Sequence, residues 1–490
     1  MLPFVPFAGS GYVFYIRSLS GAEIAFIERS RNEPYFYNYL INFTISTFFT
    51  QHNMAKILVV NPYVIDFKLY DEWMHPLGLY FLIVSLKKNG HEVFYFNCLQ
   101  QSTLTPQKKF NTGFFDSKEI EKPALYKDIN RKYKLYGRPE DELKDFLQSI
   151  PQPDMICLGS MMTYWAQGVL ETARQIRNVF SDTPLILGGI AAQLIPAFFK
   201  THIKNCQIAG SLFTDITDDR FSTVLSPISS SDSIVPALSF SNSPHGPLLL
   251  SLGCPLVCSY CASNTLQPSF IQRPLSTIAE EIDYMVVEKN ITDFAFYDDA
   301  LLFNPQVTLI PLLNSIKKKG YNLRFHTPNG LHLRFAEENL MMQLREAGFK
   351  TLRFGYESSA LKHKDDTCGK GIRKEVAEQI AVIRRCGFKS TEVGVYVMAG
   401  LQDQTPSEVL EEMDFIGSLG INVKPVFLSP VPATPLYMKY IQQFPQIGYD
   451  PLWHNDSFFI TQLPGWNTDL VEKIRLKARA LNSAHSGLSA

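Results

Sequence analysis

Short apolar runs alternate with segments of helical period through most of the chain. The run at residues 56–62 (KILVVNP) is typical of a strand buried on both faces of a parallel sheet. The next segment, residues 76–90, has proline near its start and glycine at its end, and predicts a helix. The same unit then repeats. Further strands are expected at residues 91–98, 154–160, 184–189 and 206–210, with a helix around residues 167–180.

Strands separated by helices predict an α/β fold with a doubly wound, Rossmann-like parallel sheet. A ligand crevice is expected at the carboxyl ends of the strands of such a sheet. Residues 99–150 form an insertion of mixed polarity, and residues 211–245 are rich in Ser, Asp and Pro, as in a linker. The first domain, with this linker, is therefore expected over residues 54–245.

A second alternating series begins near residue 248, where a strand runs into a cysteine-containing loop. Its six β/α units predict a partial (β/α)6 barrel of the TIM type over residues 246–430, with chemistry at the carboxyl ends of the strands. Residues 431–490 are expected to form a small, irregular C-terminal cap followed by a short helix. Later strands are expected at residues 293–299, 322–329, 351–358, 391–400 and 423–430, and helices at residues 276–289, 306–319, 336–346, 374–386 and 406–419.

Residues 1–53 differ from the rest of the chain. They are rich in Phe and Tyr, lack a sustained period, and are followed by Met54 and the first buried-strand pattern. Two interpretations remain open: a poorly structured extension, or sequence upstream of a true start at Met54. No function is assigned to this segment.

Length and charge restrict the class of protein. A chain of 490 residues exceeds what one core usually supports, so two or three domains are expected. The 46 basic and 47 acidic residues leave no electrostatic footprint for nucleic acid or anionic lipid. There is no apolar run long enough to span a bilayer and no signal-cleavage pattern, and eight cysteines at irregular spacings are typical of reduced thiols. We therefore expect a cytoplasmic protein with no nucleic-acid or membrane partner.

Three cysteines, Cys254, Cys258 and Cys261, stand close together after the first barrel strand. Thiolates hold iron–sulfur clusters, normally four thiolates to a 4Fe–4S cluster, so three would leave one iron open. Zinc would require a fourth Cys or His nearby, and residues 262–275 contain neither. A zinc knuckle and three unrelated core thiols are the alternative interpretations.

The CxxxCxxC spacing, with Tyr260 before the last cysteine and in the first loop of a six-unit barrel, resembles the radical S-adenosylmethionine (SAM) enzymes. The resemblance implies a 4Fe–4S cluster on the three cysteines, with the open iron binding the amino and carboxylate groups of SAM. It also implies an external electron donor, such as flavodoxin or ferredoxin. One electron would cleave SAM to a 5′-deoxyadenosyl radical.

Later strand ends resemble the SAM-contacting positions of that family. Asp298 and Asp299 follow the second strand, where the family contacts the methionine amino group; which of the two makes the contact is open, and a helix cap is the alternative for one. Asn329 offers a polar contact to SAM, with an ordinary turn as the alternative. Glu357 and Ser358 are placed like the family's fourth-strand residues near methionine or ribose.

The other cysteines are interpreted separately. Cys98, Cys157 and Cys206 lie in predicted strands of the first domain, as small buried residues do. Cys368 follows the fourth barrel strand and could act as a thiol hydrogen-atom donor, although an ordinary structural thiol is the alternative. No other catalytic residue is assigned.

The first domain resembles the cobalamin-binding domain of a large subclass of these enzymes. Ser160 ends one predicted strand, and Gly188 and Gly189 end the next. The resemblance implies that the serine contacts the nucleotide tail of cobalamin and that the glycines let the backbone approach it. The first loop departs from other cobalamin proteins, because it lacks the Asp-x-His-x-x-Gly motif whose histidine ligates cobalt; His75 has different neighbours. We expect cobalamin without a histidine ligand, or a fold retained without the cofactor.

These patterns predict a radical SAM enzyme that acts on a small molecule or another unidentified substrate. Cobalamin-dependent methyl transfer or related radical chemistry is the leading hypothesis. A radical SAM enzyme without cobalamin, and a non-catalytic iron–sulfur protein in sensing or electron transfer, are the alternatives.

Overall fold

The computed structural model forms two compact units, Met1–Asn53 and Met54–Ala490. In the first unit, β1 (Phe14–Leu19) pairs antiparallel with β2 (Glu23–Glu28). The two interpretations of residues 1–53 are not tested by this pairing and stay predictions. The structure describes residues 14–19, 23–28, 54–101, 107–210, 228–363, 367–368 and 372–487.

The first domain is built on a five-stranded sheet whose neighbouring strands all run parallel. The order along the sheet is β12-β11-β10-β3-β6. This is a doubly wound order, in which the winding reverses between β3 and β10, and ligands bind outside the carboxyl ends of the strands at such a switch point. The strands are β3 (Lys56–Asn61), β6 (Glu92–Asn97), β10 (Met155–Leu158), β11 (Leu185–Leu187) and β12 (Cys206–Ile208).

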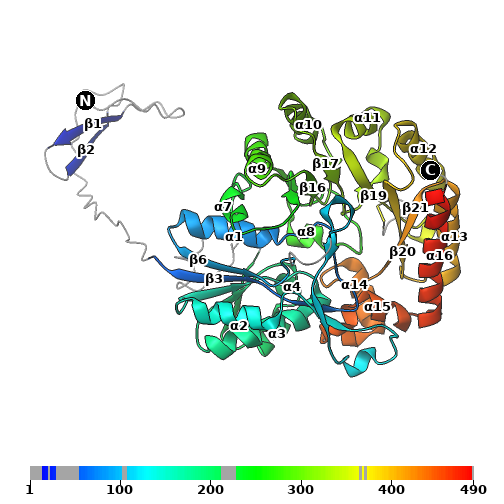
Figure 1. Cartoon of the computed structure of the whole chain (residues 1–490), viewed down its shortest axis with the longest axis horizontal. Helices are drawn as coiled ribbons and strands as arrows, with labels where there is room; N and C mark the ends of the chain where they lie inside the picture. The colour runs from blue at the N-terminus through cyan, green and yellow to red at the C-terminus, as the bar shows by residue number, and fades with distance from the viewer. Residues whose placement is uncertain are drawn as a thin grey trace. The chain divides into compact units, whose positions relative to one another are not determined.

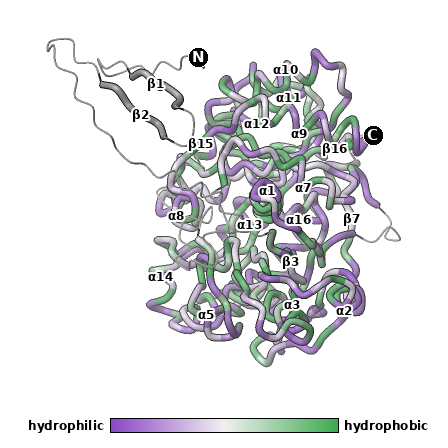
Figure 2. Tube along the Cα trace, turned by 90° about the vertical axis from the view of Figure 1, so that its left-hand side faces the viewer, coloured by the Kyte–Doolittle hydropathy of each residue, from purple (hydrophilic) through white to green (hydrophobic). Residues whose placement is uncertain are grey.

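Helices cover both faces of this sheet. Side chains alternate between the two faces along β3: Ile57 and Val59 belong to one buried cluster with α1, whereas Leu58 and Val60 belong to another with α3. Hydrophilic and hydrophobic residues alternate along α2 and α3 (Figure 2), which is typical of helices with one face in solvent. The helices are α1 (Leu77–Lys88), α2 (Glu140–Ser149), α3 (Ala166–Val179), α4 (Ile190–Leu194), α5 (Pro196–His202) and α7 (Val235–Leu238).

The insertion and the loop after β3 contain short antiparallel pairs. Strand β9 lies between β4 and β8, and β5 pairs with β7. These pairs hold the loop after β3 in place. Their bounds are β4 (Val64–Asp66), β5 (Tyr70–Asp71), β7 (Gly113–Phe114), β8 (Ser117–Glu119) and β9 (Lys134–Tyr136).

The second domain is a parallel sheet in the order β13-β16-β17-β19-β20-β21, with β18 added beside β19. Among the described residues β13 and β21 do not pair, so the barrel is open along one edge. The predicted fold class, a Rossmann-like sheet followed by a partial barrel, is confirmed (Figure 1). The strands are β13 (Gly246–Leu248), β16 (Asp293–Phe296), β17 (Arg324–His326), β18 (Leu331–His332), β19 (Phe349–Glu357), β20 (Val393–Ala399) and β21 (Asn422–Phe427).

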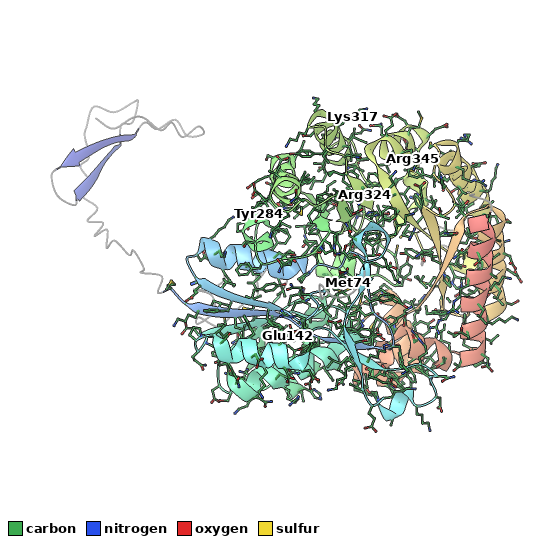
Figure 3. All side chains as sticks on the ribbon, viewed as in Figure 1. Met74, Glu142, Tyr284, Lys317, Arg324 and Arg345 are labelled. Carbon is green, nitrogen blue, oxygen red and sulfur yellow. The ribbon has the colours of Figure 1, made fainter. Side chains whose placement is uncertain are left out.

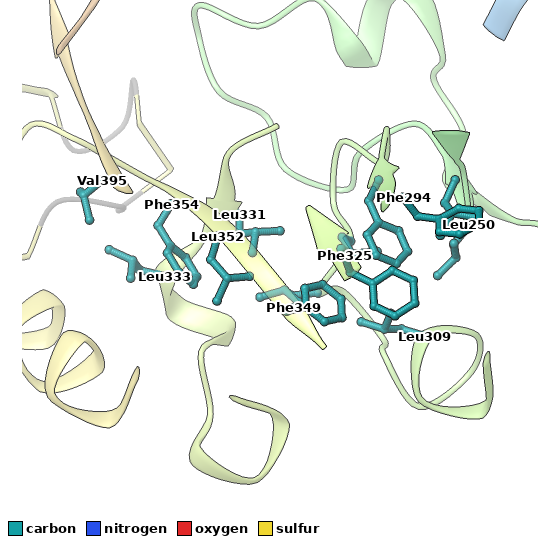
Figure 4. Close-up of a cluster of buried hydrophobic side chains, with 14 of the residues drawn as sticks. Leu250, Phe294, Leu309, Phe325, Leu331, Leu333, Phe349, Leu352, Phe354 and Val395 are labelled. Carbon is teal, nitrogen blue, oxygen red and sulfur yellow. The ribbon is translucent and has the colours of Figure 1, made fainter. Parts of the chain in front are cut away.

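Helices pack on the outer face of the barrel strands over a layer of aromatic side chains. Phe294, Phe325 and Phe349 are fully buried from three neighbouring strands, and Leu309 of α10 lies in the same cluster (Figure 4). The rings of Phe325 and Phe349 lie 5.3 Å apart. The helices are α9 (Leu275–Val287), α10 (Leu309–Lys318), α11 (Glu338–Ala347), α12 (Arg373–Arg385) and α13 (Pro406–Ser418).

The inner face of these strands is polar and receives the loop after β3. Asp293 accepts hydrogen bonds from Arg324 (2.6 Å) and His326 (3.1 Å). Trp73, from the first domain, stacks on the His326 ring with 4.2 Å between centroids. Met74, the residue after Trp73, and Arg324 are both labelled in Figure 3. The first domain therefore contributes side chains to the inner face of the barrel.

The C-terminal cap ends in a helix that is longer than expected. Helix α16 (Thr468–Gly487) has 20 residues, in place of the predicted short helix. It lies beside β21 and α13 (Figure 1), and the Asn482 side chain bonds both the N–H (2.7 Å) and the C=O (2.9 Å) of Val423. The helix thus covers an edge strand whose polar backbone groups would otherwise be exposed. The cap also contains α14 (Pro435–Gln443) and α15 (Asp456–Phe459).

Among the described helices, none is both long and apolar enough to cross a membrane.

Candidate functional site

The cysteine loop is held at its base by a short hairpin. Strand β14 (Ser251–Leu252) pairs antiparallel with β15 (Ile271–Gln272), so the two ends of the loop at residues 253–270 are held side by side. Gly253 has φ +77°, and a Cβ at this position would lie 2.6 Å from the carbonyl oxygen of Ser269. A side chain here would therefore force the base of the loop apart.

The three cysteines of this loop differ in exposure. Cys258 is buried, Cys254 is half-buried and Cys261 is exposed. The Cys261 N–H donates to the carbonyl of Cys258 at 3.1 Å, and the Cys261 thiol lies 3.2 Å from the Ser263 hydroxyl at the start of α8 (Ser263–Leu266). None of the eight cysteines forms a disulfide. The described side chains include no cluster of three or more His, Cys, Asp or Glu already arranged around a metal.

The donor set of the loop fits an iron–sulfur cluster. Three thiols are carried on one tethered segment, and a thiolate-only set suits soft metal centres, not Mg²⁺ or Ca²⁺. The loop follows β13, at the carboxyl edge of the sheet where barrel enzymes place their chemistry.

The two predicted aspartates after β16 have different surroundings. Asp298 is 3% exposed and accepts hydrogen bonds from Ser251 N (2.7 Å), Ser251 Oγ (2.6 Å) and Leu250 N (3.1 Å). Burial raises the pKa of Asp298 to about 6, although these donors favour its charged form. Asp298 therefore joins the ends of two neighbouring strands.

Asp299 faces the cysteine loop instead. It is exposed, and its carboxylate accepts a hydrogen bond from Ser263 Oγ at 2.9 Å, the hydroxyl that also contacts Cys261. Desolvation by the protein atoms around it raises the pKa of Asp299 although the residue keeps contact with solvent, and the Ser263 hydrogen bond opposes that shift. Of the two carboxylates, Asp299 is the one placed to meet an ammonium group beside the cysteines.

Alanine substitutions should separate the two aspartates. We expect Asp298→Ala to lower the free energy of unfolding by about 3 kcal/mol, because it leaves several buried donors unsatisfied. We expect Asp299→Ala to change stability by less than about 0.5 kcal/mol but to weaken SAM binding at least about tenfold. Urea unfolding and equilibrium dialysis with SAM measure these effects. The reverse pattern would assign the SAM contact to Asp298.

Tyr260 connects the cysteine loop to β19. Its hydroxyl donates to Glu357 Oε1 at 3.1 Å. Burial raises the pKa of Tyr260 well above its usual value, and the nearby Glu357 carboxylate adds to the shift, so Tyr260 stays a neutral donor. Glu357 is buried at the strand end with φ +67°, beside an irregularity in the β19–β20 register. A glutamate in this conformation is strained, and such strain is concentrated at functional sites.

The remaining predicted residues of the barrel lie at the carboxyl ends of its strands or beyond them. Ser358 is buried in a turn, where its hydroxyl accepts from Ala360 N at 3.3 Å. The Asn329 side chain donates to the carbonyl of Tyr297 at 3.0 Å, which joins the ends of β17 and β16. Cys368 is half-buried, and its carbonyl accepts from Arg334 at 2.7 Å. That contact is made by the backbone, so a hydrogen-donor role for the thiol stays a prediction.

The strand-end residues of the first domain contact one another. Ser160 Oγ donates to the carbonyl of Gly188 at 2.8 Å and accepts from Ala192 N at 2.9 Å. Gly189 has φ +99°, and a Cβ there would lie 2.1 Å from the carbonyl oxygen of Ser160. The packing of the protein itself therefore requires Gly189, independently of any ligand. At Gly188 the nearest atom to a Cβ would be Ala209 Cβ at 3.7 Å, so a methyl group fits.

His75 belongs to a buried network. Its Nε2 lies 2.9 Å from His245 Nδ1, its Nδ1 lies 3.4 Å from the Tyr80 hydroxyl, and His245 Nε2 lies 3.2 Å from Asp71 Oδ2. Burial lowers the pKa of His75 well below its usual value, so the ring is neutral. Because both ring nitrogens have polar neighbours inside the protein, His75 is not placed as a metal ligand.

Of the three first-domain thiols that are predicted to be buried, two are buried and one is half-buried. Cys98 and Cys157 are buried, and burial raises the pKa of Cys157 to about 12. Cys206 is only half-buried, because β12 is the edge strand of its sheet.

Three further side chains on the inner face of the barrel are not among the predicted site residues. Arg353, Tyr396 and Lys424 lie on adjacent strands β19, β20 and β21. The available signal was a charged residue inside an otherwise apolar strand, as in TLRFGYES and VKPVFLSP. A cavity of about 840 Å³ adjoins Tyr396 and Lys424.

Residues 248–416 match the Radical SAM superfamily. This segment is a radical SAM domain. It begins in the strand before the cysteine loop and ends in α13, so it includes the three cysteines, Tyr260, Asp299 and Glu357.

Two curated relatives of this chain are methyltransferases by name. An uncharacterised methyltransferase of Pyrococcus horikoshii is 24% identical over 197 residues, which cover 40% of this chain and 41% of the relative. The bacteriochlorophyllide d C-12(1)-methyltransferase of Chlorobaculum tepidum is 27% identical over 219 residues, which cover 41% of this chain and 46% of the relative. The chain thus matches less than half the length of these relatives.

Solved structures extend the similarity to both domains. The radical SAM methyltransferase TsrM of Kitasatospora setae, solved with cobalamin and a [4Fe-4S] cluster, has a TM-score of 0.57 at 15% identity, over 80% of this chain and 78% of that one. The cobalamin-dependent SAM radical enzyme OxsB, solved with aqua-cobalamin and SAM, has a TM-score of 0.50 at 12% identity, over 88% of this chain and 62% of that one. At these identities the likeness shows a common fold for the radical SAM domain and the domain before it.

Proposed function

We propose that this chain is a cobalamin-dependent radical SAM enzyme that performs methyl transfer or related radical chemistry. The observation that carries the proposal is the tethered loop with Cys254, Cys258 and Cys261 at the carboxyl edge of a radical SAM domain. The relatives that are methyltransferases by name, and the folds shared with TsrM and OxsB, support the choice of chemistry.

The three cysteines would hold a 4Fe–4S cluster with one open iron. When bound, the cluster supplies the electron that cleaves SAM to a 5′-deoxyadenosyl radical. Asp299 would receive the methionine ammonium group, since it is the exposed carboxylate beside Cys261. Glu357, held by Tyr260, together with Ser358 and Asn329, would provide the polar groups around the rest of SAM.

Cobalamin would bind at the switch point of the first sheet. In a doubly wound sheet the ligand crevice is expected outside the carboxyl ends of the strands at this point, here the ends of β3 and β10. Ser160 follows β10, and its hydroxyl bonds the carbonyl of Gly188 after β11. When bound, cobalamin supplies a transferable methyl group. The nearest atom to a Cβ at Gly188 would lie 3.7 Å away, so the backbone there leaves space for a ligand. The Ser160 hydroxyl bonds the Gly188 carbonyl and so joins the ends of β10 and β11. Because His75 is hydrogen-bonded within its buried network, the loop after β3 would supply no histidine ligand to the cobalt.

The proposed partners are a small-molecule substrate and an external electron donor such as flavodoxin or ferredoxin. We place the protein in the cytoplasm, because that compartment keeps thiols reduced. Neither a nucleic acid nor a membrane is proposed as a partner.

The function is tested by anaerobic reconstitution with iron, sulfide and methylcobalamin, followed by reduction in the presence of SAM. We expect 5′-deoxyadenosine and methionine to form, and a corrinoid absorption spectrum to remain after desalting. A cluster that forms but does not cleave SAM would favour the non-catalytic iron–sulfur alternative. Cleavage of SAM without corrinoid uptake would favour a radical SAM enzyme that does not use cobalamin.

A further inference from the structure

The cavity of about 840 Å³ is bounded by both domains and the C-terminal cap. Strands β20 and β21 form one wall, and α16 forms another. The first domain closes it with residues 68–72 and 129–131. Its volume lies in the range of small-molecule sites.

The charges that line this cavity are mainly positive. Five cationic side chains and three carboxylates face it. One of the carboxylates, Glu472, lies 3.8 Å from Arg475 as an ion pair. The cations are Lys68, Arg131, Lys424, Arg475 and Arg479, and the carboxylates are Glu72, Asp469 and Glu472.

Lys424 lines the cavity, and the Arg353 side chain lies beside it from β19. A Cβ added at Gly394, on the strand between them, would lie 3.2 Å from the Cδ of each. Both side chains are partly buried, and burial lowers the pKa of both. In the described part of the chain, no carboxylate lies within ion-pair distance of either residue; the charge of Glu72 favours the Lys424 ammonium only from farther away.

Two adjacent, partly desolvated cations without an ion-pair partner are costly to a folded protein. An anion bound in the cavity would offset this cost. A carboxylate or a phosphate supplies the oxygen acceptors that a guanidinium and an ammonium group recognise. The position therefore indicates a binding site for an oxyanion, not a packing defect.

The cavity lies on the same face of the barrel as the candidate site. Glu357 is four positions after Arg353 on β19, which is about 13 Å of strand. Tyr396 lines the cavity, and burial, together with the charges of Glu72 and Glu357, raises its pKa to about 12. Glu357 in turn contacts Tyr260 of the cysteine loop. A molecule anchored at Arg353 could thus extend along the strand face towards the cysteines.

We propose that this cavity binds the substrate of the enzyme, and that the substrate is a small molecule with a carboxylate or phosphate group held by Lys424 and Arg353. The carbon that reacts would lie on the order of 10 Å from that anionic group, towards Glu357. This inference rests on the proposed function for the identity of the reaction, but anion binding by the cavity can be measured without it.

Thermal unfolding of the full chain tests the site, with sodium phosphate or sodium succinate compared against sodium chloride at equal ionic strength. We expect each oxyanion to raise the Tm of the wild type by about 1–3 °C over chloride. Lys424→Met should lose this gain. In chloride alone its Tm should equal or exceed that of the wild type, because an unpaired, partly buried charge has been removed.

Lys473→Met is the matched control, since Lys473 is an exposed lysine of α16 outside the cavity lining. Phosphate is excluded from protein surfaces in general and stabilises many proteins for that reason. An equal rise of Tm in the wild type, Lys424→Met and Lys473→Met would therefore overturn the proposal, as would no rise in the wild type. Arg353→Gln, expected to lose the gain as well, provides a second variant if Lys424→Met does not fold.

The two anions distinguish the class of substrate. A response to phosphate alone supports a phosphorylated substrate, a response to succinate alone supports a carboxylate, and a response to both supports their shared chemistry. The variant with alanine at Cys254, Cys258 and Cys261 should keep the anion response. In the wild type, an anion response without SAM cleavage would therefore count against the proposed reaction alone, and SAM cleavage without an anion response would count against the cavity alone.

Discussion

Alanine at Cys254, Cys258 or Cys261 should reduce both the bound iron and the formation of 5′-deoxyadenosine to background. Each substitution removes one of the three thiolates that the loop offers, and within residues 262–275 no Cys or His stands in as a replacement. The loop should remain folded, because its base depends on the β14–β15 pairing and on Gly253, not on the thiols. Iron and sulfide analysis, together with chromatography of reduced reaction mixtures, measures the effect.

Cys386→Ala is the matched control for these substitutions. Cys386 is half-buried at the end of α12, and its thiol contacts the carbonyl of Glu338 at 3.6 Å, away from the cysteine loop. This variant should retain the full iron content and SAM cleavage. If a variant lacking all three loop cysteines kept stoichiometric iron and sulfide, the cluster would have to lie elsewhere in the chain.

Leucine at Gly188 should abolish corrinoid uptake while the iron content stays at the wild-type level. A methyl group fits at this position, since Ala209 Cβ would lie 3.7 Å away, but the proposed cobalamin site lies at this strand end, so a leucine side chain would occupy space that the cofactor needs. The cysteines lie in the other domain and should be unaffected. The absorption spectrum of protein reconstituted with methylcobalamin and then desalted measures the uptake.

Gly188→Ala and Gly189→Ala are the controls for the Gly188→Leu experiment. We expect Gly188→Ala to bind the corrinoid as the wild type does. We expect Gly189→Ala to lower the melting temperature markedly, because its Cβ would collide with the backbone of Ser160 and its φ of +99° is unfavourable for alanine. Normal corrinoid binding by Gly188→Leu would exclude the crevice beside Ser160 as the cobalamin site.

The order and type of the main elements were predictable because they depend on local patterns. Apolar runs on both faces of a strand, and proline and glycine at helix ends, are properties of short segments. Helix α13 begins at Pro406 behind a capping box of Thr405 and Glu408, as its sequence indicates. The cysteine motif was predictable for the same reason, since its three thiols are close together along the chain.

The roles of single site residues depended on contacts that are distant in sequence. Asp298 and Asp299 are chemically identical neighbours, yet one bonds Ser251, 47 residues away, and the other bonds Ser263, 36 residues away. The sequence predicts Gly189 as a ligand-contacting glycine, and that role stays a prediction; what the structure adds is that a side chain there would collide with Ser160. Sequence position alone does not specify which neighbour a side chain meets.

The sequence by itself determined the two-domain α/β architecture and the segment that carries the cysteines, because both follow from periodicity and spacing within a few tens of residues. Only the tertiary structure decided how the open edge of the barrel is covered by α16, and which charges meet inside it. Arg353 and Lys424 are 71 residues apart in the chain, and parallel strand pairing places them on either side of Gly394. Strand pairing over such separations is decided by packing of the whole core, which a local pattern does not contain.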